Sequence, residues 1–253
     1  MSSDPAGKTP RPGPTALPGP AHPHDPDFYD QSYYEFNGQI GDRPALRWYV
    51  RLVRRYVGPG PYLDFGCGTG FLVRRLSGIG EAAGFEVSEF SARRARRTAP
   101  GCTVHTDMSG FADGSFGGLT AIHVLEHLED AQVAEALATW RRVLRPGGRA
   151  LVVMPDPAGR ARALTGTGWA GYSDPTHINL KSHAQWRRVL GEHGFVVRRE
   201  GSDGLWDVPY RGLPKLVDAG LHAVPSLAQF LAGRLALRPG SGESAVFVVE
   251  RAA

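Results

Sequence analysis

The stretch that decides the fold is Tyr62-Leu63-Asp64-Phe65-Gly66-Cys67-Gly68-Thr69-Gly70. In it a short apolar run ends in an acidic residue, and three glycines follow at every second position. The pattern predicts a buried strand that turns sharply into a helix, because glycine adopts φ > 0 and lets the backbone lie against a ligand. The spacing differs from the Gly-x-Gly-x-x-Gly of dinucleotide sites, and the Gly-Lys-Ser/Thr of a P-loop is missing. The loop therefore indicates a nucleoside site of another class.

Four further segments follow the glycine loop in a fixed order. They are residues 82–88, an apolar run with Glu86 near its end; residues 103–108; residues 118–127, which end in Val-Leu-Glu-His; and residues 144–154, where a Pro-Gly-Gly turn precedes an apolar run. In this order and spacing the chain resembles the class I, Rossmann-like, S-adenosylmethionine-dependent methyltransferases of the small-molecule type. The resemblance extends from about Tyr33 to Val249.

This resemblance implies S-adenosyl-L-methionine as the cofactor and S-adenosyl-L-homocysteine as the product. Glu86 would hold both ribose hydroxyls, Asp107 would accept from the adenine amino group, and Met108 would cover the ring. The structural alternatives are an exposed strand-end carboxylate at Glu86 and a turn residue at Asp107. Tyr33 or Tyr34 would donate to the methionine carboxylate, with ordinary aromatic packing as the alternative. The other expected cofactor contacts are Asp64, Gly66, Cys67, Gly68, Gly70, Phe85, Val87 and His123.

Helix and strand signals alternate along the rest of the chain and predict an α/β fold. We expect a doubly wound, seven-stranded, mostly parallel sheet with an antiparallel last strand and helices on both faces. Residues 1–26 are a Pro-rich tail without the apolar side chains to offset its ordering entropy, so we expect them to be disordered. Residues 27–253 are expected to form one methyltransferase domain with inserted lid segments near 155–180 and 203–242. The second insertion is a helical cap or a self-association surface, and the latter would give a homodimer.

Composition excludes several classes of function. The 253 residues carry 29 basic and 25 acidic side chains, a net charge of +4, and the basic clusters are typical of solvated helix faces. No Asn/Asp-Pro-Pro-aromatic motif of base-amino methylation follows residues 118–122, so no nucleic-acid partner is expected. Two cysteines give neither a disulfide framework nor a metal-ligand spacing, so no metal is expected. No apolar run reaches transmembrane length and no signal peptide is evident, so the sequence predicts a cytoplasmic protein without a membrane span.

Methyl transfer requires alignment, and a hydroxyl or amine acceptor must also lose a proton, most often to a histidine. His177 lies in Asp174-Pro-Thr-His-Ile-Asn, which resembles a stretch of many bacterial small-molecule methyltransferases. His177 is therefore the expected base, and Asp174 would orient it or bind a substrate hydroxyl. The alternative is a turn that fixes the loop through backbone hydrogen bonds.

His123 follows the fourth strand directly and is expected to face the methyl group, as a catalytic residue or as part of the pocket wall. Glu126 and His127 are interpreted as scaffolding at a helix start. Trp169 and Tyr172, with His177, are the expected substrate contacts, and ordinary lid packing is the alternative for the two aromatic residues.

The sequence thus predicts a methyltransferase that moves a methyl group to an oxygen or nitrogen of a small-molecule acceptor, with a specialised metabolite as the expected substrate. Two alternatives stay open. One is an enzyme of the same fold that binds S-adenosylmethionine but catalyses a non-methylating step such as cyclisation. The other is a non-catalytic partner protein.

Overall fold

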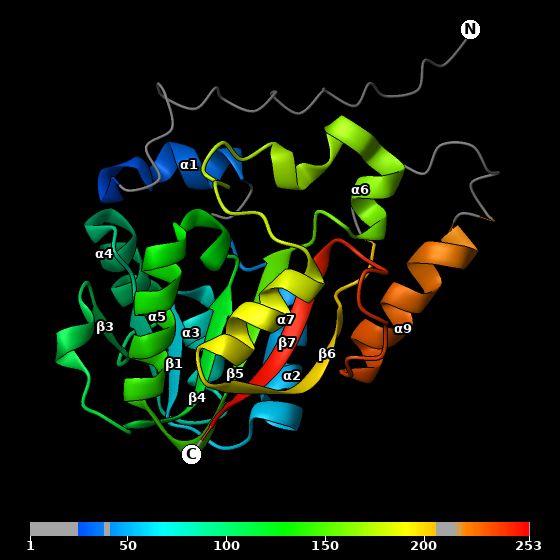
Figure 1. Cartoon of the computed structure of the whole chain (residues 1–253). Helices are drawn as coiled ribbons and strands as arrows, with labels where there is room; N and C mark the ends of the chain where they lie inside the picture. Colours follow the sequence, from blue (N-terminus) through cyan, green and yellow to red (C-terminus); the bar gives the residue numbers. More distant parts are fainter. Residues whose placement is uncertain (1–24, 38–40, 206–216, 218, 253) are drawn as a thin grey trace, which may run out of the picture.

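One central sheet organises the computed structural model, which describes residues 25–37, 41–205, 217 and 219–252 (Figure 1). Its strands are β1 (Tyr62–Phe65), β2 (Ala82–Phe85), β3 (Thr103–His105), β4 (Phe116–Ile122), β5 (Leu144–Pro155), β6 (Phe195–Ser202) and β7 (Ser244–Arg251). The strand order is β3-β2-β1-β4-β5-β7-β6. β1 to β5 pair in parallel, and β7 is antiparallel to both β5 and β6. The expected sheet with its antiparallel last strand is confirmed.

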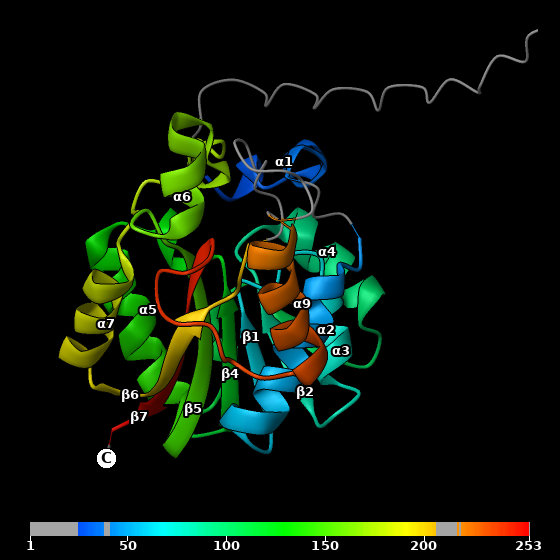
Figure 2. The same ribbon diagram turned by 90° about the vertical axis from the view of Figure 1, so that its right-hand side faces the viewer.

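Helices cover both faces of this sheet (Figure 2). On one face α5 (Asp130–Val143) and α7 (His183–Glu192) pack their apolar sides into a core shared with the strands. On the other face α2 (Pro44–Leu52), α3 (Phe71–Leu76) and α4 (Glu89–Thr98) form a second core. β5 contributes side chains to both cores, because successive side chains of a strand point to opposite faces of the sheet. Val152 lies in the first core and Leu151 in the second.

Two added segments lie over the edge where the parallel strands end. α1 (Gln31–Phe36) follows a short helix, η1 (Pro26–Phe28). The insertion after β5 contains α6 (Arg160–Thr165) and two further short helices, η5 (Gly166–Gly168) and η6 (Ala170–Tyr172). Both segments lie at the top of Figure 1, above the carboxyl ends of β1 and β4. Ligands of open α/β sheets bind at these strand ends, so the fold places a site beneath the two lids.

The insertion between β6 and β7 contains η7 (Ala219–Ala223) and α9 (Val224–Ala232). α9 is tied to α2 by Arg51, whose Nη1 donates to the carbonyl of Phe230 at 2.9 Å. The described part of the insertion exposes five large apolar side chains, Val217, Leu221, Val224, Leu227 and Leu231. Self-association through this insertion stays a prediction.

Two expectations fall partly outside the described residues. Of the tail expected to be disordered, residues 1–24 lie outside them, as do residues 206–216 and 218 of the second insertion.

None of the helices within the described residues combines the length and the apolar character needed to cross a membrane.

Candidate active site

A cleft of about 350 Å³ lies at the carboxyl ends of β1, β2 and β4. A volume of this size is within the range of small-molecule and cofactor sites. Eight of the predicted cofactor contacts line it: Tyr33, Gly66, Gly68, Phe85, Glu86, Val87, Met108 and His123. Tyr29 and Tyr34 close the same cleft from the side of α1. The strand-end residues and the N-terminal aromatics, far apart in sequence, are therefore brought together.

Glu86 anchors the glycine loop as well as lining the cleft. Its Oε2 accepts from the backbone N–H of Gly68 at 2.7 Å, and its Oε1 accepts from the N–H of Ser88 at 3.0 Å. Burial raises the pKa of this carboxyl above its usual value, although backbone hydrogen bonds from Ser88, Gly68 and Val87 counteract the shift. A carboxylate offers about four acceptor positions. The positions that the backbone does not use remain available for a hydroxyl group of a ligand.

The three glycines of the loop serve different purposes. Gly68 has φ +52°, and a Cβ there would lie 3.3 Å from the ring of Tyr34, so this glycine keeps the cleft open beneath the aromatic lid. Gly70 has φ +84°, and a Cβ there would lie 2.6 Å from the Cα of Ala95 on α4. It lines neither of the hollows beside the loop. Gly70 therefore allows α3 and α4 to pack closely, and its contact with the cofactor stays a prediction.

Replacing Gly70 by valine is expected to lower the free energy of unfolding by about 2–4 kcal/mol, since it combines a left-handed backbone with overpacking. Gly101→Val is the matched control, because Gly101 also has positive φ (+85°) but nothing lies within 4 Å of its Cβ position. Urea denaturation of both variants measures the difference. Equal losses would show that contact with Ala95 contributes nothing.

Asp64 and Cys67 line a smaller hollow on the other side of the loop. The Asp64 carboxylate accepts from the Thr120 hydroxyl at 2.6 Å. Burial raises the pKa of Asp64 to about 7, and the nearby Glu86 carboxylate contributes to the shift. Burial also raises the pKa of the Cys67 thiol. Both residues thus lie next to the glycine loop without lining the main cleft.

The raised pKa of Asp64 predicts a pH-dependent stability. Below about pH 4 the carboxyl is protonated in both the folded and the unfolded chain, and above it only the folded chain keeps the proton until pH approaches 7. The folded state binds more protons in this window, so Asp64 makes stability fall as pH rises through it. Asp64→Asn should remove this contribution. Melting temperatures of both proteins at pH 4.5 and pH 8 test it, and an unchanged pH slope in the variant would contradict it.

Asp107 and Tyr172 lie outside the cleft. The Asp107 carboxylate is exposed and accepts from the N–H of Ser109 at 2.6 Å, capping the short helix η3 (Met108–Gly110). The ring of Tyr172 is half-exposed and packs edge-on against Trp169, with 5.0 Å between centroids. In this structure Asp107 makes the contact of a turn residue and Tyr172 that of a lid residue, and their ligand contacts stay predictions.

A second hollow, of about 430 Å³, lies beneath the lids beside the first. The predicted substrate residues Trp169 and His177 line it, together with Asp174. Tyr33, His123 and His127 line both hollows. The two cavities therefore adjoin at these three side chains, and a ligand group in one can reach a group in the other there.

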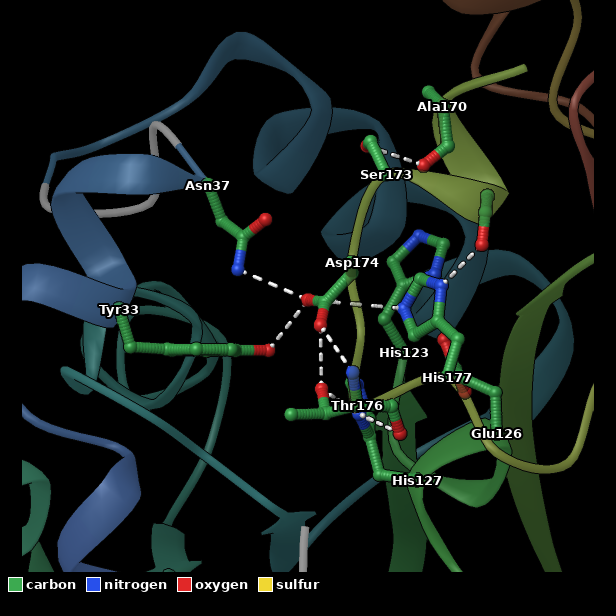
Figure 3. A network of polar contacts seen from close by, with 11 residues as sticks. Tyr33, Asn37, His123, Glu126, His127, Ala170, Ser173, Asp174, Thr176 and His177 are labelled. Atoms are coloured by element: carbon green, nitrogen blue, oxygen red, sulfur yellow. Dashed lines mark hydrogen bonds and ion pairs between the residues drawn. The ribbon is translucent and has the colours of Figure 1, made fainter. Parts of the chain in front are cut away.

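Asp174 joins the two lids (Figure 3). Its Oδ2 accepts from the Tyr33 hydroxyl at 2.9 Å and from Asn37 Nδ2 at 3.0 Å, both from the α1 region. Its Oδ1 accepts from the N–H and the hydroxyl of Thr176. Burial raises the pKa of Asp174, but the Thr176 hydrogen bonds outweigh it and hold the pKa below its ordinary value. An ionised, fully used carboxylate thus fixes the roof of the second hollow.

Three imidazoles converge below this roof (Figure 3). His123 follows β4 with φ +57°, and its Nδ1 lies 3.1 Å from Oε1 of the buried Glu126. His177 Nδ1 lies 2.7 Å from the Gly171 carbonyl, and its Nε2 lies 4.0 Å from Asp174. Burial lowers the pKa of His127. A non-glycine residue with positive φ at a strand end is typical of functional sites.

His127 and Glu126 were expected to be scaffolding at a helix start. They do lie in the short helix η4 (Leu125–His127), but His127 also forms part of the wall between the two hollows. Tyr29, Asn37 and Thr176 were missed altogether. The only sequence signal for Tyr29 was the aromatic-rich segment around it, because lid contacts depend on the tertiary path of the chain.

Comparison with known proteins identifies the family. The model of the methyltransferase domain family matches residues 39–200, well over half of the chain. The chain belongs to this family. Its relatives include the O-methyltransferase cnsE of Penicillium expansum, 36% identical over 183 residues that make up 66% of this chain and 63% of that protein. A highly reducing polyketide synthase, ltbA of Aspergillus luteorubrus, is 28% identical over 64% of this chain and 6% of its own length. The methyltransferase thus spans less than two thirds of these curated relatives.

Solved structures share the methyltransferase fold. A SAM-dependent methyltransferase from Archaeoglobus fulgidus superposes with a TM-score of 0.56 at 17% identity, covering 87% of this chain and 99% of that one. Geranyl diphosphate C-methyltransferase from Streptomyces coelicolor A3(2) superposes with a TM-score of 0.53 at 15% identity, covering 80% of this chain and 75% of that one. The expected family and fold are confirmed, and the roles of individual site residues stay predictions.

Proposed function

We propose that this methyltransferase transfers a methyl group from S-adenosylmethionine to an oxygen of a small molecule held in the second hollow. The observation that carries the proposal is the junction of the two hollows at Tyr33, His123 and His127. One hollow is lined by the family's cofactor motifs and the other by the lid insertion. A cofactor and an acceptor placed in them would meet at His123.

The first hollow suits S-adenosylmethionine in shape and in chemistry. Glu86 lines the hollow and keeps acceptor capacity for a ribose hydroxyl, while Phe85 and Met108 offer apolar walls for a base. Gly68 leaves the room that a Cβ would fill. When bound, this cofactor supplies an activated methyl group, and its transfer depends mainly on proximity and alignment.

We assign the acceptor proton to His123. The contact with Glu126 Oε1 places the proton of His123 on Nδ1, because a carboxylate only accepts. Nε2 then carries the lone pair, and His123 lines the acceptor hollow. A buried carboxylate that orients a histidine base is a recurring catalytic arrangement. His177, the base expected from the sequence, lines the acceptor hollow but not the cofactor hollow, and it and Asp174 would position the acceptor.

An oxygen acceptor is supported by the relative named as an O-methyltransferase, and a specialised metabolite by the polyketide synthase relative. Nitrogen remains the alternative acceptor atom. Two free thiols, Cys67 and Cys102, fit a reducing compartment, so we place the reaction in the cytoplasm.

The test is formation of S-adenosylhomocysteine and of a product heavier by one methyl group, with phenolic, alcoholic and amine acceptors followed by mass spectrometry. Glu86→Ala is the negative control. Product that gains a methyl group on oxygen supports the proposal. A converted substrate without S-adenosylhomocysteine would favour a non-methylating step such as cyclisation, and binding without any turnover would favour a non-catalytic partner.

A further inference from the structure

Glu126, His127 and His177 meet at the floor of the acceptor hollow. Each offers a metal-ligand atom, and these atoms lie within 4.8 Å of one another. Although the sequence spacing gave no reason to expect a metal, we propose that these three side chains bind one divalent transition-metal cation, of the Zn²⁺ type, in this methyltransferase.

Glu126 supplies the first argument. Its side chain is 0% exposed. Oε1 contacts His123, but Oε2 is buried and has no hydrogen-bond partner within the part of the chain that the structure describes. A buried polar atom without a partner is costly and calls for an explanation, such as an ion. A cation at Oε2 supplies the missing interaction.

The two imidazoles are oriented as ligands. The Thr176 hydroxyl donates to Asp174, so it must accept from His127 Nδ1–H, which lies 2.8 Å away. His177 Nδ1–H donates to the Gly171 carbonyl at 2.7 Å. In both rings Nε2 then carries the lone pair. A metal-binding histidine characteristically donates its other N–H to a carbonyl, carboxylate or similar partner in this way, which sets its tautomer.

The donor set selects the kind of ion. Two imidazoles and one carboxylate are the protein ligands of several catalytic zinc sites, whereas Mg²⁺ and Ca²⁺ prefer oxygen alone. Bonds of about 2.0–2.2 Å require donors about 3.3 Å apart, so the three side chains must draw together on binding. His177 lies in the irregular segment between η6 and α7, so the shift requires no change within a helix or strand.

The open side of the ion would face the acceptor. His127 and His177 both line the acceptor hollow, whereas Glu126 lies beneath it. Three protein ligands leave a coordination position for a substrate oxygen, and coordination lowers the pKa of that hydroxyl. The proton would pass to His123, and the oxygen would then attack the methyl group. This last step rests on the proposed function, while the metal site itself does not.

The binding test uses the full chain, stripped of metal and titrated calorimetrically with Zn²⁺ alone. We expect one equivalent per chain and an affinity that falls about tenfold or more in both Glu126→Gln and His177→Gln. His22→Gln/His24→Gln is the matched control, because it removes two histidines of the tail and should leave the stoichiometry at one. Circular dichroism confirms the fold of each variant. Zn²⁺ affinity unchanged in both ligand variants, or lost in the tail variant, overturns the site.

Methyl transfer then separates the two proposals. If stripped protein methylates as fast as the Zn²⁺-loaded protein, the ion has no role in transfer and that step is overturned. If Zn²⁺ binds as expected but no acceptor is methylated, the metal site stands and the proposed function fails. If Zn²⁺ accelerates methyl transfer and His177→Gln loses this acceleration, the result supports both the metal site and the proposed function.

Discussion

Replacing His123 by alanine should reduce the methyl-transfer turnover roughly 10²–10⁴-fold, the usual contribution of a positioned general base. The reason is geometric: His123 is held by the buried Glu126 and lines both hollows. Affinity for S-adenosylmethionine should change much less, because Glu86 and the glycine loop remain. Steady-state kinetics and calorimetry measure the two effects separately.

His193→Ala is the control for the loss of an imidazole, because His193 contacts the Val189 carbonyl at the end of α7 and lines neither hollow. It should keep the parental turnover. If His123→Ala keeps normal turnover and His177→Ala loses most of it, then His177 is the general base. If neither substitution lowers the turnover, the enzyme works by aligning the cofactor and the acceptor alone.

Replacing Glu86 by alanine should weaken S-adenosylmethionine binding about thirtyfold or more. Hydrogen bonds to a charged group contribute about 1.5–3 kcal/mol, and 1.4 kcal/mol corresponds to a factor of ten in affinity. The variant loses the ribose acceptor and also releases the Gly68 and Ser88 N–H groups that Glu86 holds. Calorimetry with S-adenosylmethionine gives the result directly.

Asp107→Ala is the matched control, since both acids follow strands at the same edge of the sheet. The structure turns the Asp107 carboxylate to the Ser109 N–H instead of into the cleft. Its removal should therefore change the affinity less than threefold by our estimate for an exposed cap. A larger loss for Asp107 than for Glu86 would mean that the adenine contact forms on binding and that the ribose contact does not.

Much of the fold was predictable because its signals are local. Alternating apolar runs and turns specify parallel strands, and a glycine loop after a strand specifies the position of a nucleoside site. Glu86 could be assigned for the same reason. It follows directly on β2, and the carboxyl ends of neighbouring parallel strands necessarily meet at one edge.

Tertiary structure alone decided the acceptor side. Tyr33 and Asp174 are 141 residues apart, and only the paths of two lid segments bring them into a hydrogen bond. From the sequence, Gly68 and Gly70 were both predicted to contact the cofactor, although Gly68 faces Tyr34 and Gly70 faces Ala95. The convergence of Glu126, His127 and His177 was hidden for the same reason. A local pattern determines which backbone a segment adopts, whereas the neighbours of a side chain depend on how distant segments pack against it.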